Sequence, residues 1–424
     1  MKVLVISSTP WSSDNSFGNS FSNIFDGIEG LEFANIYCKA GIPDNSLNMV
    51  YYQLSEKKLL KSVFKRGVST GRVVVPDSNG SAETQSVTGR EAARKLRFTW
   101  MLWVRDLIWK AGKWKTKELE EFIDSFNPDI IFQPVYFSTY LNEIALYAKK
   151  RTGKKMLGYI SDDNYTLRQF SLSPLYWIDR LIKRRYVKRT VKSCEILYCI
   201  SEIQKAEYEK IFSVPCKVLT KCADFTPPPE LKREPSSSVK LAFTGNLGAG
   251  RWKSVSYITD ALKSINTDGI KAQLYIYSAT PLTEKQRSSI ADGKNALFMG
   301  AVPSDEIQGI QKDADILVHA EGTGLKSRLQ VHQSFSTKIV DYLKNARAVL
   351  AVGPKDAASI DYFIKNGSAV VATDRTEVEA ALTKLINEPG EIKKYAEKAY
   401  YCGRKNHSAD IIKKMVYDDM SANI

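Results

Sequence analysis

The sequence predicts an α/β protein made of two Rossmann-like domains, whose parallel sheets face each other across a cleft. Two observations lead to this fold class. A chain of 424 residues is too long for one ordinary hydrophobic core and fits two domains. Short apolar segments alternate with helical stretches, and this alternation occurs once in each half of the chain. Near-continuous apolar strands joined by helices are typical of parallel sheets that are buried on both faces.

The expected strands follow from that alternation. In the first half they cover residues 3–7, 33–38, 130–133, 156–160, 196–200 and 217–219. In the second half they cover residues 240–244, 273–277, 297–299, 316–319, 349–352 and 369–372.

The domain boundaries come from composition. Residues 226–238 (TPPPELKREPSSS) are rich in Pro and Ser and lack periodicity, so they are the expected linker. This assigns residues 1–225 to a first domain and 239–390 to a second, followed by charged helices over 391–424. Residues 65–91 are polar and rich in Gly and Ser, which predicts a mobile surface insertion.

The composition limits the classes of function. A formal net charge of +14 indicates an anionic partner, either a membrane surface, a nucleic acid or a phosphorylated substrate. No apolar run approaches the roughly 20 residues that span a bilayer, and the start MKVLVISSTPW predicts a first strand and not a signal peptide. The six cysteines have no metal-ligand spacing, so free thiols in a reducing cytoplasm are expected.

The segment 334–354 (SFSTKIVDYLKNARAVLAVGP) points to a ligand site. Ser336 and Thr337 are helix-start residues, and the start of a helix offers free N–H groups and a positive dipole end to a diphosphate. Lys338 adds a positive charge in the first turn, where acids are usually favoured, so a bound anion would explain it. Asp341 lies on the same helix face as Thr337 and could accept hydrogen bonds from ribose hydroxyls. An ordinary capped helix is the alternative.

A second phosphate signal is the loop 243–254 (FTGNLGAGRWKS). Gly245, Gly248 and Gly250 follow a strand and allow a close approach of the backbone, while Arg251 and Lys253 could neutralise phosphate. Glycines alone are weak support, because a tight turn from strand to helix needs them anyway. The two cations strengthen the interpretation.

These two segments resemble the donor site of bacterial retaining GT-B glycosyltransferases of the family 4-like group, the capsule and O-antigen type. The resemblance covers nearly the whole chain and implies an N-terminal acceptor domain and a C-terminal domain that binds a nucleotide sugar. It implies that Arg251 contacts the diphosphate, with Lys253 as the second candidate. The loop that carries Gly245 would be the phosphate loop of the second domain.

The same resemblance aligns two acidic positions. The family pattern of two glutamates separated by seven residues falls on Gln333 and Asp341, with Thr337 between them. Asp341 keeps the charge that binds ribose, on a shorter side chain. Gln333 would lie near the donor sugar without the usual charge.

Two further loops carry expectations from the resemblance. The stretch 298–307 (FMGAVPSDEI) is similar to the family segment whose backbone reads the nucleobase, which would put Val302 against the base. A plain turn between strand and helix explains it equally well. The Asn-rich loop after the first strand, with Gly18 and Asn19, resembles the N-terminal loop of this class and could hold sugar hydroxyls. A solvated turn is the alternative.

Asp162 and Asp163 follow a predicted strand at the edge expected to face the cleft. Adjacent acids repel, so burial of both would raise at least one pKa. This indicates orientation of the acceptor or removal of its proton, although exposed loop acids are an equal alternative. The resemblance implies no nucleophile, because such enzymes are thought to react on one face of the donor, with the donor phosphate assisting.

No divalent metal is expected, and no cofactor apart from the nucleoside-diphosphate sugar as co-substrate. The sequence Asp313-Ala314-Asp315 mimics a metal-binding motif, but it precedes a strand and is expected to cap that turn.

The segment 94–117 combines cations with a stripe of Leu96, Trp100, Trp103 and Leu107 at helical spacing. Such a helix can lie on an anionic membrane, and a polyprenyl-linked acceptor would give it a reason to do so. A helix that packs its tryptophans into the core is the alternative. The basic run 180–192 is a second candidate patch, or a solvated helix.

The sequence therefore predicts a metal-independent, retaining glycosyltransferase that uses a nucleotide sugar, with UDP favoured. The acceptor is expected to be a bacterial surface glycan or its polyprenyl-diphosphate-linked precursor, and the location the cytoplasm or the inner face of the membrane. A sugar-nucleotide epimerase and a non-catalytic nucleotide-sugar-binding subunit are the alternatives. A nucleic-acid-binding protein is disfavoured, because the cations are dispersed and no such motif occurs.

Overall fold

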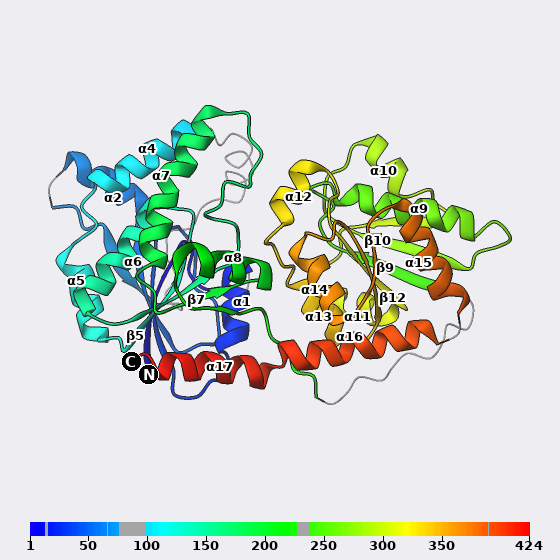
Figure 1. Ribbon diagram of the computed structural model, residues 1–424. Coiled ribbons are helices and arrows are strands. Elements are labelled where there is room, and N and C mark those ends of the chain that lie inside the picture. The colour runs from blue at the N-terminus through cyan, green and yellow to red at the C-terminus, as the bar shows by residue number, and fades with distance from the viewer. Residues whose placement is uncertain (13–15, 66, 76–98, 227–237, 389) are drawn as a thin grey trace.

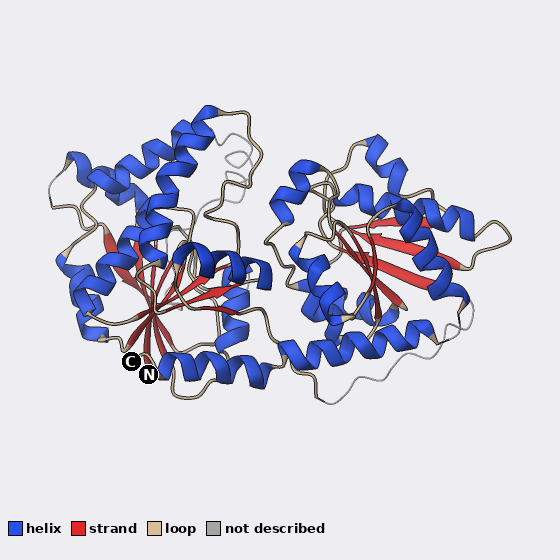
Figure 2. Ribbon diagram, viewed as in Figure 1, coloured by secondary structure: helices blue, strands red, loops and turns tan. Residues whose placement is uncertain are grey.

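The computed structural model describes residues 1–12, 16–65, 67–75, 99–226, 238–388 and 390–424 (Figure 1). They form two α/β domains, so the predicted fold class is confirmed. Figure 2 shows helices on both faces of each sheet. Every predicted strand is present, and its ends differ from the expected ones by one residue at most.

The sheet of the first domain has the order β4-β3-β2-β1-β5-β6-β7-β8, and all neighbours are parallel except β3 and β4. The central strand β1 pairs with β2 on one side and β5 on the other. The strands are β1 (Lys2–Ser7), β2 (Glu32–Tyr37), β3 (Met49–Leu54), β4 (Gly71–Val74), β5 (Ile130–Pro134), β6 (Met156–Ile160), β7 (Ile196–Cys199) and β8 (Cys216–Val218).

Strands β3 and β4 were not predicted, and β4 corrects the expectation of an insertion over 65–91. Val73 and Arg72 of β4 pair with β3 in an antiparallel register. Gly71 lies against Tyr52, since a Cβ on Gly71 would be 2.3 Å from the tyrosine ring. A short strand at the edge of a sheet has one partner only, so its sequence needs no continuous apolar run. Residues 76–91 are outside the described part of the chain.

The sheet of the second domain is entirely parallel, with the order β11-β10-β9-β12-β13-β14. This is the doubly wound order, in which the chain reverses direction across the sheet between β9 and β12. Ligands of such sheets bind outside the carboxyl ends of the strands at that point. The strands are β9 (Val239–Thr244), β10 (Ala272–Tyr277), β11 (Ala296–Gly300), β12 (Ile316–Ala320), β13 (Ala348–Val352) and β14 (Val370–Ala372).

Helices connect the strands in each domain. In the first domain they are α1 (Ser16–Phe25), α2 (Glu56–Phe64), α4 (Thr99–Ala111), α5 (Lys117–Phe126), α6 (Thr139–Thr152), α7 (Pro174–Val191) and α8 (Glu202–Phe212). In the second they are α9 (Arg251–Ile265), α10 (Glu284–Ile290), α11 (Glu306–Asp313), α12 (Leu325–Val331), α13 (Lys338–Lys344), α14 (Ala358–Asn366) and α15 (Arg375–Asn387). No helix among the described residues is both long and apolar enough to cross a bilayer.

Two C-terminal helices run along both domains (Figure 1). Helix α16 (Glu391–His407) packs against α13 and β13, and α17 (Ala409–Ser421) packs against α1 of the first domain. Asp419 of α17 accepts a hydrogen bond of 2.8 Å from the hydroxyl of Tyr198, which lies on β7 of the first sheet. The predicted linker falls almost entirely on residues 227–237, which lie outside the described part.

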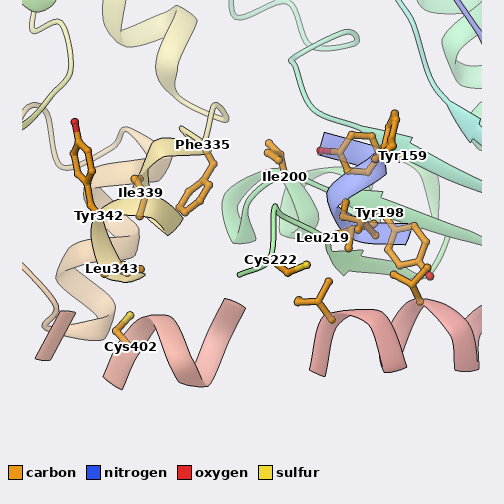
Figure 3. Packing of buried hydrophobic residues seen from close by; sticks show 14 of the residues in the cluster. Tyr159, Tyr198, Ile200, Leu219, Cys222, Phe335, Ile339, Tyr342, Leu343 and Cys402 are labelled. Atoms are coloured by element: carbon orange, nitrogen blue, oxygen red, sulfur yellow. The ribbon is translucent and has the colours of Figure 1, made fainter. Parts of the chain in front are cut away.

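One hydrophobic cluster continues from the first domain into the second along these helices. Figure 3 shows it passing from Tyr159 and Tyr198 to Phe335 and Ile339. The six cysteines are free thiols, as predicted, and all of them are buried.

The cluster passes between the domains where Phe225 crosses α16. The Tyr400 hydroxyl donates a hydrogen bond to the carbonyl of Phe225. Gly403 leaves the space for the Phe225 ring, because a Cβ there would be 2.4 Å from the ring and 2.8 Å from Leu343.

We expect Gly403→Ala to lower the free energy of unfolding by about 1–3 kcal/mol through overpacking. The control is Gly309→Ala in α11, where a Cβ meets no atom within 4 Å and alanine should stabilise the helix by about 0.5–1 kcal/mol. Thermal and chemical unfolding of both variants would measure the difference. Equal effects of the two substitutions would contradict the packing described here.

Candidate functional site

The loops after β9 and β12 meet at the carboxyl ends of these strands. A Cβ on Gly322 would be 2.1 Å from the carbonyl oxygen of Ala249, and one on Gly250 would be 2.6 Å from the Ser327 hydroxyl. Gly250 also has a φ of +79°, a backbone conformation that favours glycine. The two loops therefore pack backbone to backbone at the point where a doubly wound sheet binds its ligands.

A buried carboxylate lies where these loops meet. Glu321 follows β12 and is 1% exposed, and its Oε2 is 3.0 Å from both Nε and Nη2 of Arg251. Its Oε1 accepts a hydrogen bond of 3.1 Å from the Ser359 hydroxyl and lies 3.4 Å from Nε2 of His319. Burial alone would raise the pKa of Glu321, but His319, Arg251 and Ser359 together lower it. An ionised Glu321 thus fixes the direction of the Arg251 guanidinium.

Sequence reasoning missed Glu321, because the two acidic positions of the family were aligned with later residues. A signal was present: an acid directly after a fully buried strand and followed by Gly322. Carboxyl ends of parallel strands are the usual place for functional side chains.

Lys338 joins Arg251 on this side of the sheet. Its Nζ donates a hydrogen bond of 3.0 Å to the carbonyl of Thr244, and a Cβ on Gly245 would be 2.7 Å from that Nζ. Burial, and then the charge of Arg251, lower the pKa of Lys338, while Asp341 acts in the opposite direction. The two positive charges repel each other, and an anion bound between them would relieve that repulsion.

The other residues predicted to contact the donor lie at two helix starts and at one edge of the sheet. Helix α13 begins at Lys338, and Thr337 takes the N-cap position, so the predicted helix start is confirmed, although its side chain makes no capping hydrogen bond. Lys253 is exposed, and its Nζ lies 5.7 Å from the centre of the Trp252 ring. Val302 is half-buried in the turn after β11, the edge strand of the sheet.

Asp341 contacts the other domain. Its Oδ1 forms an ion pair of 2.6 Å with Lys221, which follows β8 of the first domain. The predicted ribose-binding carboxylate therefore lies on the side of α13 that faces the first domain.

Gln333 is also an interdomain residue. It is 2% exposed, its Nε2 donates to Glu207 of α8 at 2.6 Å, and its carbonyl accepts from the Ser201 hydroxyl at 2.8 Å. Glu207 further pairs with Arg168 and with Nε2 of His332, at 3.0 Å from the latter. Burial would raise the pKa of Glu207, but His332, Gln333 and Arg168 together lower it. The position of Gln333 relative to a donor sugar stays a prediction.

The two adjacent acids after β6 differ from each other. Asp163 accepts hydrogen bonds from the amides of Tyr165 at 3.1 Å and Thr166 at 2.7 Å, and from the Tyr208 hydroxyl at 3.2 Å. Its Oδ1 is 3.4 Å from Nη2 of Arg180. Asp163 is thus committed to the internal bonding of this loop.

Asp162 lies in the same loop and is exposed. Desolvation raises the pKa of Asp162, a hydrogen bond from Ser161 lowers it, and the charge of Asp163 raises it further. The Gln204 side chain donates to the Asp162 carbonyl at 3.1 Å and to Oε1 of Gln333 at 3.4 Å. One side chain of α8 therefore joins the Asp162 loop to the second domain.

The N-terminal loop is more apolar in its packing than its sequence indicates. Trp11 is fully buried and stacks on Phe21 and Phe25. Gly18 lies inside α1 and is buried, and Asn19 is the next helical residue.

The aspartates that mimic a metal motif are structural. Oδ2 of Asp315 accepts the amide of Lys240 at 2.7 Å, and Asp313 pairs with the Lys240 side chain. This agrees with the expected role of Asp315 at the turn. Within the described ranges, no group of three or more His, Cys, Asp or Glu side chains could hold a metal ion.

A comparison with known protein families finds a match to the second domain. Residues 238–388, which include Arg251, Glu321 and Lys338, match the family model of group 1 glycosyl transferases. No curated protein sequence matches the chain.

Solved structures resemble the chain over its full length. HepE from Anabaena, in complex with UDP and glucose, has a TM-score of 0.61 at 10% identity and covers 100% of both chains. A trehalose-6-phosphate structure from E. coli, bound with UDP-2-fluoro glucose, has a TM-score of 0.60 at 11% identity over 99% of both chains. Sucrose-phosphate synthase from Thermosynechococcus elongatus has a TM-score of 0.59 at 10% identity over 99% of both chains. The chain thus has the GT-B fold of glycosyltransferases, and the family match falls on its second domain.

Proposed function

We propose that this protein is a glycosyltransferase that takes a sugar from a nucleoside-diphosphate donor, with a UDP sugar favoured. The observation that carries the proposal is the convergence of Arg251 and Lys338 beside the Gly245 loop, with Arg251 oriented by the buried Glu321. A diphosphate would neutralise both cations. Support comes from the match of this domain to group 1 glycosyl transferases and from neighbours of the same fold that are bound to UDP and to a UDP sugar.

The two cations also suit the chemistry of transfer. When the bond between the anomeric carbon and the phosphate oxygen breaks, negative charge develops on the leaving diphosphate. Arg251 and Lys338 would stabilise that charge, because they are oriented before the reaction begins. They can supply the charge that a divalent metal supplies in other transferases, which fits a metal-independent reaction.

The remaining donor contacts follow from the resemblance. The ion pair with Lys221 uses Oδ1 of Asp341, and the other carboxylate oxygen would accept the ribose hydroxyls. The backbone of Val302 would meet the nucleobase. Thr337 and Lys253 would complete the phosphate contacts at the two helix starts.

On the acceptor side, Asp162 is the group that we assign to the reaction. Its carboxylate would orient the acceptor hydroxyl, whose oxygen forms the new bond to the anomeric carbon while its proton passes to the donor phosphate. This route keeps the anomeric configuration. Asp163 would act by holding the loop, and Gly18 and Asn19 would border the acceptor.

For the acceptor we propose a bacterial surface glycan carried on a polyprenyl diphosphate, used at the inner face of the membrane. The net charge of +14 favours such an anionic surface. Conversion of a UDP sugar without any acceptor would instead favour an epimerase, and donor binding without turnover would favour a binding subunit.

The donor site can be tested by calorimetric titration with UDP, GDP, ADP, dTDP and CMP. We expect one nucleoside diphosphate to bind tightly. Arg251→Ala and Lys338→Ala should each weaken it about 10–100-fold, the loss expected for a charge-assisted hydrogen bond. The control is Lys344→Ala at the other end of α13, which should leave affinity unchanged. If neither site variant differs from the control, the cations do not bind the diphosphate.

Two variants can distinguish ribose binding by Asp341 from the ion pair that Asp341 forms with Lys221. Asp341→Ala should weaken the binding of the nucleoside diphosphate about tenfold, because the ribose loses a charged acceptor, and should not affect inorganic diphosphate. Lys221→Ala removes the same ion pair but leaves the carboxylate, so donor affinity should be kept. Equal losses in both variants would mean that Asp341 acts by linking the domains.

Substitutions of Asp162 and Asp163 should have different effects on stability and on turnover. Asp163→Asn should lower the free energy of unfolding by about 1–3 kcal/mol, because its partners lose a charged acceptor. Asp162→Asn should leave stability unchanged or increased, since burial disfavours the charge, yet lower the rate of transfer. Because the pKa of Asp162 is raised, the wild-type rate should fall on acidification at a higher pH than for an ordinary aspartate, and Asp162→Asn should remove that fall. Normal turnover by Asp162→Asn would exclude it from the reaction.

A further inference from the structure

Helix α4 exposes a row of large apolar side chains. Trp100 is 57% exposed and Leu107 is 64% exposed, and Met101 and Val104 lie between them with nearly half of their surface open. Trp100, Val104 and Leu107 recur every three or four residues and so share one face of the helix, with Met101 beside them. Apolar residues on a helix of a soluble domain normally face its core, so this face lacks a partner among the described residues.

Helix α7 has a similar face. Leu175, Ile178, Leu181 and Ile182 are each more than one third exposed, at helical spacing. In the loop before the helix, Leu172 is 89% exposed. Single exposed apolar side chains are common on proteins, but contiguous rows of them indicate a contact surface.

The two faces are parts of one surface. The Trp103 indole donates a hydrogen bond of 3.1 Å to Asp179, which joins α4 to α7. Leu107 and Ile182 both line a groove of about 600 Å³ between the helices. Figure 1 shows α4 and α7 side by side at the end of the first domain away from the C-terminal helices.

The tryptophans of the segment 94–117 differ in their exposure to solvent. Trp109 is buried and stacks on Tyr140, and Trp114 is buried against Tyr147. Trp100 alone projects widely into solvent, and Leu96 lies outside the described residues. Core packing is therefore confirmed for Trp109 and Trp114, and contact with a membrane stays a prediction for the exposed Trp100. The second basic patch is less solvated than its sequence indicates, because Arg180 and Lys183 are buried.

Positive charge borders the apolar surface. Lys110, Lys113 and Lys115 line the same groove, and Arg185 and Lys188 of α7 are exposed. The nearby acids are partly neutralised, since Asp179 pairs with Lys183 at 2.8 Å and Glu143 with Arg189 at 3.7 Å. Apolar side chains bordered by lysine and arginine are typical of a helix that lies in the interface of an anionic bilayer.

The same helix is fixed to the proposed acceptor loop. Arg180 of α7 donates to the carbonyl of Thr166 at 2.7 Å and to that of Asp163 at 3.0 Å. Asp162 directly precedes Asp163 in the chain. A bilayer held against α7 would therefore lie beside the loop that we assign to the acceptor.

We propose that α4, α7 and the loop that carries Leu172 dock on an anionic lipid bilayer. Trp100, Leu107, Leu172 and Leu181 enter the interface, while the lysines around the groove bind lipid phosphates. The docking rests on the exposed surface itself. Its purpose, the delivery of a lipid-linked acceptor to Asp162, rests on the proposed function.

The test is flotation of the full chain with vesicles of equimolar phosphatidylcholine and phosphatidylglycerol, and with vesicles of phosphatidylcholine alone. The wild type should float with the anionic vesicles at low salt and be released as salt rises. The double variants Trp100→Ser with Leu107→Ser, and Ile178→Ser with Leu181→Ser, should each bind at least about tenfold more weakly, because exposed apolar area no longer enters the interface.

The control is the double variant Ile364→Ser with Ile411→Ser, whose side chains are 45% and 55% exposed on α14 and α17. It should float like the wild type. Nucleoside-diphosphate affinity should be the same in all three variants, which also shows that each is folded.

Absence of flotation at low salt, or equal flotation of all variants, would overturn the proposal. So would a dimer in sedimentation that is lost only in the α4 and α7 variants, because the surface would then bind a second copy of this chain. Flotation without affinity for any nucleoside diphosphate would reject the proposed function and leave the docking surface standing. Donor binding without flotation would reject the docking surface alone.

Discussion

The arrangement of the two domains depends on the hydrophobic contact of Phe225 with α16. The chain leaves the first domain at this point, and the ring of Phe225 occupies the space above Gly403. Leu343 of α13 lies against the same place, and α13 is the helix that carries Lys338 and Asp341. The packing that joins the domains thus also holds α13, the helix whose side chains we assign to the donor. Helix α17 then returns the chain to the first domain, so the position of the second domain is fixed at both ends of the connection.

Polar contacts between the domains add geometric constraints to that packing. Glu207, Gln204 and Ser201 of the first domain all bind Gln333, and Gln204 also holds the Asp162 loop. On the other side of the site, the charge of Glu321 orients Arg251. Side chains from distant parts of the sequence therefore hold the proposed acceptor and donor groups in a common frame. Such prior orientation is what an electrostatic mechanism of transfer requires.

Much of the fold could be predicted from the sequence, because most of the buried parallel strands are continuous apolar runs, and every predicted strand is present. The edge pair β3 and β4 was missed, since a strand such as Gly71–Val74 has too little apolar sequence to be recognised. In the candidate site, Arg251 and Lys338 were predicted from loop and helix patterns. Glu321 and the separate environments of Asp162 and Asp163 were not, because they depend on contacts such as those with Arg251 and Arg180, which lie far away in the sequence.

The amide of Gln333 has a consequence for how this sequence can vary. A glutamate in its place would bring a second carboxylate to the position now 2.6 Å from Oε2 of Glu207, in a site that is almost closed to water. Two like charges so close in a region of low dielectric repel strongly. The glutamine and Glu207 therefore constrain each other, and a glutamate could stand at position 333 only together with a neutral or basic residue in place of Glu207.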